Sequence, residues 1–149
     1  MGKKNSIDYA WNEKDGIATC IIRGDIRGRV REYVGTAHVH PEDEDMKSEL
    51  VGCEIAEYRA NIELMKDYLV NELEPGLAAL KQLYYSMKHS SQFSPKGYEA
   101  KMLYRQIRLK EEDIEFIKQE IAKIKQFIKY YINRKDQNYQ HIRKKRNSK

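Results

Sequence analysis

The chain has 149 residues, of which 34% are charged and 40% hydrophobic, and its formal net charge is +5. This length predicts a single domain over residues 1–149, and the hydrophobic fraction is too high for a disordered chain. No apolar run approaches the ~20 residues of a membrane-spanning helix. The first residues lack the apolar segment of a secretory signal, and two cysteines are too few for a disulfide framework. We therefore expect a cytoplasmic protein, with Cys20 and Cys53 as small buried thiols.

Residues 1–40 predict a small antiparallel sheet. Residue types that favour strands occupy Ile7–Trp11, Ile17–Ile22 and Val30–Val39. Asp15-Gly16 is typical of a hairpin turn between the first two runs, and the two glycines of segment 23–28 are expected to separate the second run from the third. A three-stranded meander has little core of its own, so it must pack on another element.

The rest of the chain predicts two long helices. The first covers residues 46–90, with apolar residues three or four apart from Val51 to Met87 and a kink near Pro75. The second covers residues 97–141, with a similar seam from Leu103 to Tyr131 that is interrupted at Lys110. Residues 142–149 form a basic tail. The predicted fold class is α+β, in which a small N-terminal antiparallel β-sheet precedes a long antiparallel α-helical hairpin.

The second helix also predicts self-association. A second apolar line widens its stripe beyond what one partner helix can cover, and it consists of Phe116, Ala122, Phe127 and Tyr130. Apolar surface of this width favours at least a dimer formed through the helices. Charge is concentrated here as well, because residues 96–149 carry 16 Lys and Arg against 7 Asp and Glu. Such an excess suits nucleic-acid phosphates, or cations that interact with the C-terminal end of a helix dipole.

The sequence gives little support to an enzyme. His38 and His40 precede the acidic run Asp43–Asp45, but a metal centre needs three or four converging ligands, and these acids suit the start of a helix. No catalytic triad and no glycine-rich phosphate loop is evident. Glu54 and Glu57 share a helix face and are interpreted as solvated flanks of the seam. We expect a protein that is not an enzyme and carries no metal or cofactor.

Two groups of residues suit an anionic ligand, and the first lies in the predicted sheet. Arg23, Arg27, Arg29 and Arg31 fall within nine residues and are spaced by glycines. Guanidinium groups bind phosphate through two parallel hydrogen bonds, and glycine allows a close approach of the backbone. The alternative is an edge strand made polar against aggregation.

The second group surrounds the turn between the helices. Aromatic rings beside guanidinium and hydroxyl groups are typical of a nucleotide site, because the rings stack on a base while the donors bind phosphates. The alternative is that the rings belong to the helix seam and the arginines are surface charges. The candidate residues are Tyr84, Tyr85, His89, Ser90, Ser91, Gln92 and Phe93 on one side, with Lys101, Tyr104, Arg105 and Arg108 on the other.

The chain resembles the first type of phage Thoeris anti-defence proteins. The segments that carry the resemblance are Tyr33–Ala37, His40–Asp45 and Ala56–Ala60, together with Arg23, Arg27, the aromatic turn and an arginine early in the second helix. The resemblance implies a sheet followed by two long helices that assemble dimers, and dimers into a hexamer. It also implies a sponge that sequesters cyclic ADP-ribose isomers, or cyclic oligonucleotides, without cleaving them, in the cytoplasm of an infected bacterium.

Under this hypothesis the ligand site combines the arginine-rich strand of one chain with the aromatic turn of its partner. The expected ligand-binding residues are Arg23, Arg27, Arg29, Tyr84, Tyr85, Ser91, Phe93, Tyr104, Arg105 and Arg108. The alternative function is a nucleic-acid-binding or structural phage protein that uses the basic C-terminal third.

Overall fold

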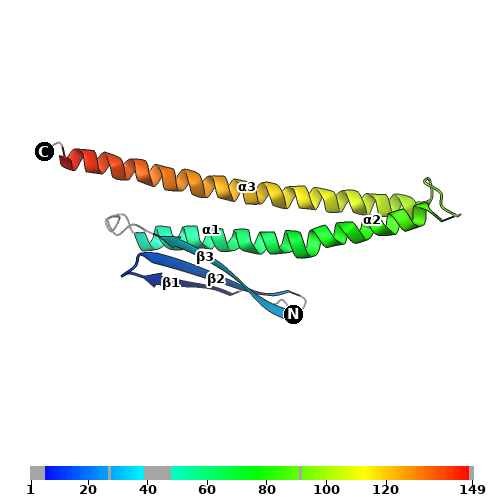
Figure 1. The fold of residues 1–149 in the computed structure, drawn as a ribbon, viewed down its shortest axis with the longest axis horizontal. Helices are drawn as coiled ribbons and strands as arrows, with labels where there is room; N and C mark the ends of the chain where they lie inside the picture. Colours follow the sequence, from blue (N-terminus) through cyan, green and yellow to red (C-terminus); the bar gives the residue numbers. More distant parts are fainter. Residues whose placement is uncertain (1–5, 27, 39–47, 91, 148–149) are drawn as a thin grey trace. The chain divides into compact units, whose positions relative to one another are not determined.

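The structure is a computed structural model, and it describes residues 6–26, 28–38, 48–90 and 92–147. The chain divides into two compact units. Unit 1 comprises residues 1–64 and 123–149, and unit 2 comprises residues 65–122. The fold is α+β, as predicted, because a three-stranded antiparallel sheet precedes the helices (Figure 1). Within the described residues, every helix is too short or too polar to cross a bilayer.

The sheet of unit 1 has the strand order β1-β2-β3, with β1 at Ser6–Asn12, β2 at Ile17–Ile26 and β3 at Arg29–His38. Strand β2 is longer than predicted, because pairing with β3 continues to Ile26 opposite Arg29. The expected break over residues 23–28 is therefore confined to the short connection between Ile26 and Arg29. Gly28 supports this connection with a φ of 77°, a backbone conformation that side chains disfavour.

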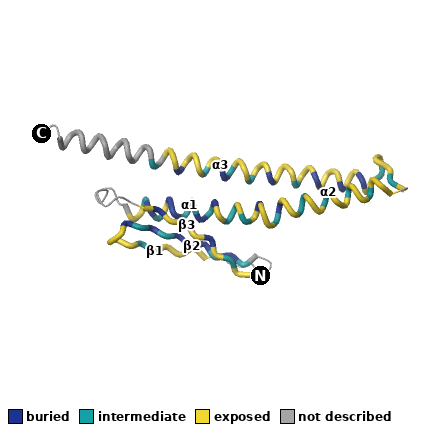
Figure 2. The backbone as a smooth tube through the Cα atoms, in the orientation of Figure 1, coloured by how far each residue is buried: buried dark blue, intermediate teal, exposed yellow. Residues whose placement is uncertain are grey.

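Helix α1 (Ser48–Tyr68) packs on one face of the sheet, and in Figure 2 buried residues alternate with more exposed ones along β2 and β3. The residues on this inner face are small, with Ala18, Cys20 and Ala37 at most 2% exposed. Ala56 and Ala60 of α1 are fully buried opposite them. The backbones approach so closely that a Cβ at Gly35 would lie 2.0 Å from the carbonyl oxygen of Ala56.

A hydrogen bond and a ring contact extend the packing of α1. The Arg59 Nη1 donates to the carbonyl oxygen of Thr36 in β3, at 2.7 Å. The Tyr58 ring meets the edge of Phe127 in helix α3, with centroids 5.3 Å apart. In unit 1, α1 therefore contacts the sheet on one side and α3 on another.

Unit 2 is an antiparallel helical hairpin. It contains the π-helical turn η2 (Leu69–Leu73), helix α2 (Glu74–Lys88), a turn, and the first half of α3 (Tyr98–Asn147). Leu69, Leu73 and Ile114 form a buried cluster, against which Leu77 and Ile117 pack. These residues belong to the predicted seams, so the periodicity identified the packed faces.

The helix predicted over residues 46–90 runs without a break from Ser48 to Lys88, but its hydrogen-bonding pattern changes at η2, directly before Pro75. The Glu74 N–H donates to the carbonyl oxygen of Leu69, five residues earlier, and Pro75 then occupies the first turn of α2. Proline has no N–H, so a carbonyl of the preceding turn lacks its helical donor here, and the irregular turn η2 lies where this donor is missing. Helix α3 continues beyond the predicted end at 141 to Asn147, because no proline or glycine follows Gly97.

Candidate functional site

The sheet holds Arg23 between two carboxylates. Its Nε donates to Glu32 Oε1 at 2.8 Å, and its Nη1 donates to Asp8 Oδ2. Hydrogen bonds to Glu32 and then to Asp8 raise the pKa of Arg23, so this guanidinium stays charged and is engaged by protein partners. An incoming phosphate would have to compete with both carboxylates.

Arg29 and Arg31, two of the other predicted arginines of the sheet, do not share a face with Arg23. The register pairs Arg23 with Glu32, and Ile26 with Arg29. Because side chains alternate between faces along a strand, Arg29 lies on the inner face and Arg23 on the outer face. Arg31 lies two residues after Arg29 on the same strand, so it shares the face of Arg29, and it is half-buried. Arg27 lies outside the described residues.

The turn of unit 2 contains a hollow of about 500 Å³, which we call the turn pocket. A volume of this size falls within the range of small-molecule sites. Two backbone hydrogen bonds between residues three apart shape its wall. The Phe93 N–H donates to the Ser90 carbonyl oxygen, and the Gly97 N–H donates to the Ser94 carbonyl oxygen. Its lining residues are Met87, Ser90, Gln92, Phe93, Ser94, Gly97, Tyr98, Glu99 and Ala100.

The predicted aromatic residues of the turn divide into two contacts. The Tyr84 ring meets the Phe93 ring edge to face, with centroids 6.0 Å apart, so Tyr84 supports a wall of the turn pocket. Tyr85 is exposed and contacts His89 instead, with ring centroids 4.4 Å apart. Ser91 lies outside the described residues. Ser90 and Gln92, which belong to the predicted group, line the pocket, and so does Tyr98, which the sequence analysis did not name.

Tyr104, Arg105 and Arg108 lie together on α3 and border a separate shallow depression with Leu109 and Glu112. The spacing of three and four residues places the side chains at 104, 105 and 108 over neighbouring parts of the helix surface. These three predicted residues therefore lie together on a surface that is distinct from the turn pocket. We call it the arginine face.

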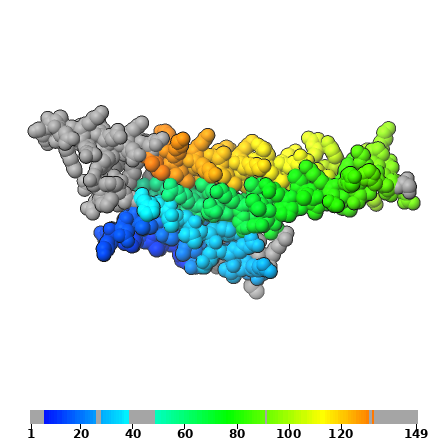
Figure 3. All heavy atoms as spheres, viewed as in Figure 1, coloured from blue at the N-terminus to red at the C-terminus, as the bar shows by residue number. Residues whose placement is uncertain are grey.

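The end of unit 2 is strongly basic. Residues 75–110 contain seven Lys and Arg but one acidic residue, Glu99. Figure 3 shows the surface formed here by the end of α2, the turn and the start of α3. Concentrated positive charge of this kind attracts anions and raises their local concentration.

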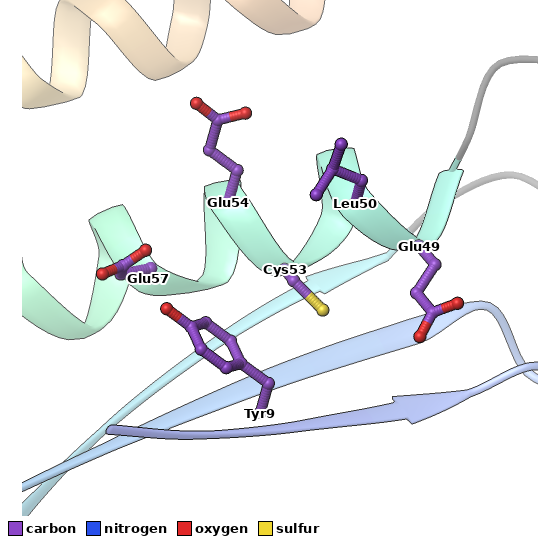
Figure 4. Close-up of a pocket in the computed structure, with 6 residues that line it drawn as sticks. All are labelled: Tyr9, Glu49, Leu50, Cys53, Glu54 and Glu57. Atoms are coloured by element: carbon purple, nitrogen blue, oxygen red, sulfur yellow. The ribbon is translucent and has the colours of Figure 1, made fainter. Parts of the chain in front are cut away.

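Unit 1 contains a larger hollow that the sequence analysis did not predict. This β1–α1 groove has a volume of about 960 Å³ and is lined by Tyr9, Glu49, Leu50, Cys53, Glu54 and Glu57. In Figure 4 the Tyr9 ring and the Cys53 sulfur occupy the space between β1 and α1, whereas Leu50 and Glu54 point away from the sheet. The sequence signal that could have indicated this groove was the spacing of Glu49, Cys53 and Glu57 at every fourth residue.

The β1–α1 groove is electrostatically negative. Partial burial raises the pKa of Cys53, and the nearby carboxylate of Glu49 raises it further. Burial and a hydrogen bond to Glu57 likewise raise the pKa of Tyr9. None of the described lining residues is Lys or Arg. The groove therefore disfavours phosphate and favours positively charged groups.

The histidine and acidic residues considered for a metal site are only partly described. His38 ends β3 and is exposed, whereas His40 and Asp43–Asp45 lie outside the described residues. Among residues that the structure describes, no three His, Cys, Asp or Glu side chains are grouped to hold a metal ion.

No protein-family model matches the chain, and no curated protein matches it. A solved structure titled "Crystal Structure of Rv2632c" is similar to it at 26% sequence identity, over 63% of this chain and 96% of that chain, with a TM-score of 0.34. A TM-score of this size is too low to transfer a fold or a function.

Proposed function

We propose that this protein binds and sequesters a nucleotide-type anion, without cleaving it, at the basic end of unit 2. The excess of seven Lys and Arg over one acidic residue in residues 75–110, beside a hollow with aromatic walls, carries the proposal. The positive charge binds the phosphates of such an anion, and the exposed rings stack on its base.

The proposed contacts follow from the local chemistry. Arg105 and Arg108 bind phosphate oxygens, because both are exposed on one part of α3. Neither is held between two carboxylates as Arg23 is. Phe93 and Tyr98 stack on the base, and Ser90 and Ser94 supply hydroxyl groups. The resemblance implies capture of the ligand without cleavage, so we assign the turn pocket binding and no hydrolysis.

The resemblance to Thoeris anti-defence proteins supplies the ligand class for this proposal. It implies a cyclic ADP-ribose isomer, with cyclic oligonucleotides as a further group, captured in the cytoplasm of an infected bacterium. Sequestration of such a signal would inhibit the antiphage defence that it activates. A homo-oligomer, either a dimer or a hexamer assembled from dimers, remains part of the proposal.

Isothermal titration with cyclic ADP-ribose tests the proposal. Arg105→Ala and Arg108→Ala are each expected to weaken binding by about 10- to 150-fold, the equivalent of about 1.5–3 kcal/mol for hydrogen bonds to a charged group. Lys118→Ala, an exposed cation further along α3, is the matched control and should leave the affinity unchanged. The ligand should be recovered intact after heat denaturation. Unchanged affinity in both arginine variants would contradict the proposal, and a degraded ligand would indicate an enzyme.

A second candidate is nucleic-acid binding by the basic C-terminal third. The observation that favours it is that α3 is one uninterrupted helix from Tyr98 to Asn147, within a segment that carries 16 Lys and Arg against 7 Asp and Glu. Affinity for a DNA duplex would then fall steeply with salt and be lost on truncation after Arg143. A nucleotide held in the turn pocket should survive this truncation.

A further inference from the structure

Strand β1 is the part of the sheet that helix α1 does not cover. Ile7, Tyr9 and Trp11 lie on the inner face, because the register places them opposite buried residues of β2. Ile7 is nevertheless 44% exposed and Tyr9 is 50% exposed. The reason is geometric, since a helix about 10 Å wide covers roughly two strands that lie about 4.8 Å apart.

Side-chain size on the inner face increases away from the helix. In the row where α1 lies against β3, Gly35 is followed by Cys20 of β2 and then by Tyr9 of β1. The next row has alanine in β3 and β2 and Trp11 in β1. Small residues allow α1 to lie close to β2 and β3, whereas the Tyr9 ring stands beside the helix (Figure 4). Rings of this kind bury about 150–250 Å² each when they are packed, so their place on the uncovered strand indicates a partner there.

The outer edge of β1 is open to a further strand. Within the described residues only β2 pairs with β1, and the seven pairs follow each other without a bulge. Proteins usually protect such an edge with lysine, proline or a bulge, and β1 has none of these. Its one charged residue, Asp8, already forms an ion pair with Arg23. The other edge strand, β3, differs, because Arg59 donates to its Thr36 carbonyl oxygen.

We infer that β1 pairs antiparallel with β1 of a second copy of this chain, around a two-fold axis at Tyr9. Centred there, the seven-residue strand Ser6–Asn12 overlaps its copy over its whole length. Antiparallel strands form about one backbone hydrogen bond for each pair of opposed residues. Opposed residues share a face, and this register opposes odd-numbered residues with odd-numbered ones. Two three-stranded sheets therefore join into one sheet of six strands, with both α1 helices on the same face.

The side chains of β1 are complementary to themselves in this register. On the inner face Tyr9 opposes its own copy and Ile7 opposes Trp11, and cross-strand pairs of aromatic and β-branched residues are favourable. On the outer face Asp8 opposes Ala10, so like charges do not meet. A two-fold axis at Asp8 would instead oppose this carboxylate with its own copy and would reduce the overlap to five pairs. The residues of β1 therefore select the axis at Tyr9.

The pairing also covers the exposed rings. Strand β1 and its copy are together about 10 Å wide, at about 4.8 Å per strand, and they lie between the two α1 helices. The β1–α1 groove of each copy forms one side of this trough, and Tyr9 and Trp11 of both copies fill its floor. Burial of their apolar surface stabilises the dimer. A second copy thus accounts for both the open edge and the large residues on the uncovered strand.

Cysteine crosslinking of the full-length chain tests the register. Ser6 and Asn12 are exposed and oppose each other across the proposed axis, whereas each lies about 20 Å from its own copy, six residues away at about 3.4 Å per residue. In a Cys20→Ala/Cys53→Ala background, Ser6→Cys chains and Asn12→Cys chains should form a disulfide when they are refolded together and oxidised with diamide. Either chain alone should remain without a crosslink, because a disulfide needs Cα atoms within about 7 Å.

A change of charge at Ala10 separates this contact from other modes of self-association. Ala10 is exposed on the outer face, so a charged side chain there should leave the single chain folded. Ala10→Asp opposes Asp8 of the copy twice and should raise the concentration needed for half-maximal mixed crosslinking about tenfold. Ala10→Lys is the matched control, because it opposes Asp8 with a cation, and it should leave this concentration unchanged or lower it.

Three outcomes would overturn the inference. Absence of the mixed crosslink, in chains whose circular dichroism is native, would show that β1 does not pair with its copy in this register. Equal crosslinking of Ser6→Cys chains alone would indicate random collision. Equal effects of Ala10→Asp and Ala10→Lys would show that Ala10 does not oppose Asp8 of a second copy. None of these outcomes depends on ligand binding in the turn pocket, so the two proposals can fail separately.

Discussion

Gly35 is the residue on which the contact between sheet and helix depends most. A side chain there would meet the Ala56 oxygen at 2.0 Å and the Ala60 nitrogen at 2.4 Å, and both are backbone atoms that cannot rotate away. The close approach also explains why alanine occupies the facing positions of α1. Small residues on both elements allow the helix to lie directly on β2 and β3.

We expect Gly35→Val to destabilise the protein by about 3 kcal/mol or more, because the helix would have to move off the sheet. Urea denaturation followed by circular dichroism measures this loss. Gly28→Ala is the matched control, since a Cβ there meets nothing within 4 Å and the only cost is its φ of +77°. That strain should cost about 1 kcal/mol. Equal losses in the two variants would show that close packing at Gly35 is not the cause.

The two cysteines predict a loss of stability in alkali. Burial raises the pKa of both Cys20 and Cys53, so the folded chain holds them as neutral thiols. The unfolded chain releases these protons first, above about pH 8.5, the ordinary pKa of a thiol. Stability from this source is therefore complete below that pH and is lost as the pH rises through the raised values.

The urea midpoint should accordingly fall between pH 7.5 and pH 9.5. In a Cys20→Ala/Cys53→Ala variant the fall should be smaller, because alanine does not titrate. If the variant and the native chain lose stability in parallel over this interval, the thiols are not responsible.

Among the elements, the π-helical turn η2 shows how one extra residue is accommodated. Apolar positions at Ile62, Met65 and Leu69 keep the usual spacings of three and four. From Met65 through Leu69 and Leu73 to Leu77, however, three spacings of four follow each other. A π-helical turn takes up an additional residue, so Leu69 and Leu73 both remain buried in the cluster with Ile114.

Deletion of Val70, an exposed residue of η2, should convert this turn to α-helix at a cost within about 1 kcal/mol. The remaining apolar residues would then alternate at three and four throughout. Deletion of Ala79 in α2 should cost about 3 kcal/mol instead, because it removes Leu80 and the following residues from the packed face. Thermal denaturation of both variants measures the difference. A Val70 deletion as damaging as the Ala79 deletion would contradict this account of η2.

At the scale of the whole molecule, exposed apolar residues on α3 predict self-association. Met102, Leu109 and Phe116 recur at intervals of seven and are 37%, 43% and 60% exposed. They lie beside the buried seam of Leu103, Ile107 and Ile114 rather than in it. A regular apolar line outside the packed face is typical of a helix that contacts another chain.

Phe116→Asp is expected to reduce self-association without unfolding the chain, because the side chain is largely exposed. Light scattering at micromolar concentration should show the mass falling towards 17.7 kDa, the mass of one chain. Lys118→Asp changes an exposed residue of the same helix to the same side chain and should leave the mass unchanged. A native chain that is already monomeric would contradict the predicted assembly.

The sequence by itself determined the fold class, the order of the elements and the packed faces of the helices. Period-two strands, the Asp15-Gly16 turn and the spacing of Leu103, Ile107 and Ile114 are local signals, and local signals do not depend on distant parts of the chain. The same signals indicated the residues of the aromatic turn and of the arginine face. They did not predict that these residues form two separate surfaces.

Tertiary structure alone decided which functional groups are available. Arg23 and Arg29 belong to the same predicted group of arginines, yet strand pairing places Glu32 and Asp8 beside Arg23. Likewise, Tyr9 has the pattern of a core residue, and it stays half exposed because one helix covers only two of the three strands. Both outcomes arise from contacts between residues far apart in the chain. Such contacts depend on register and on the width of packed elements, which local sequence patterns do not encode.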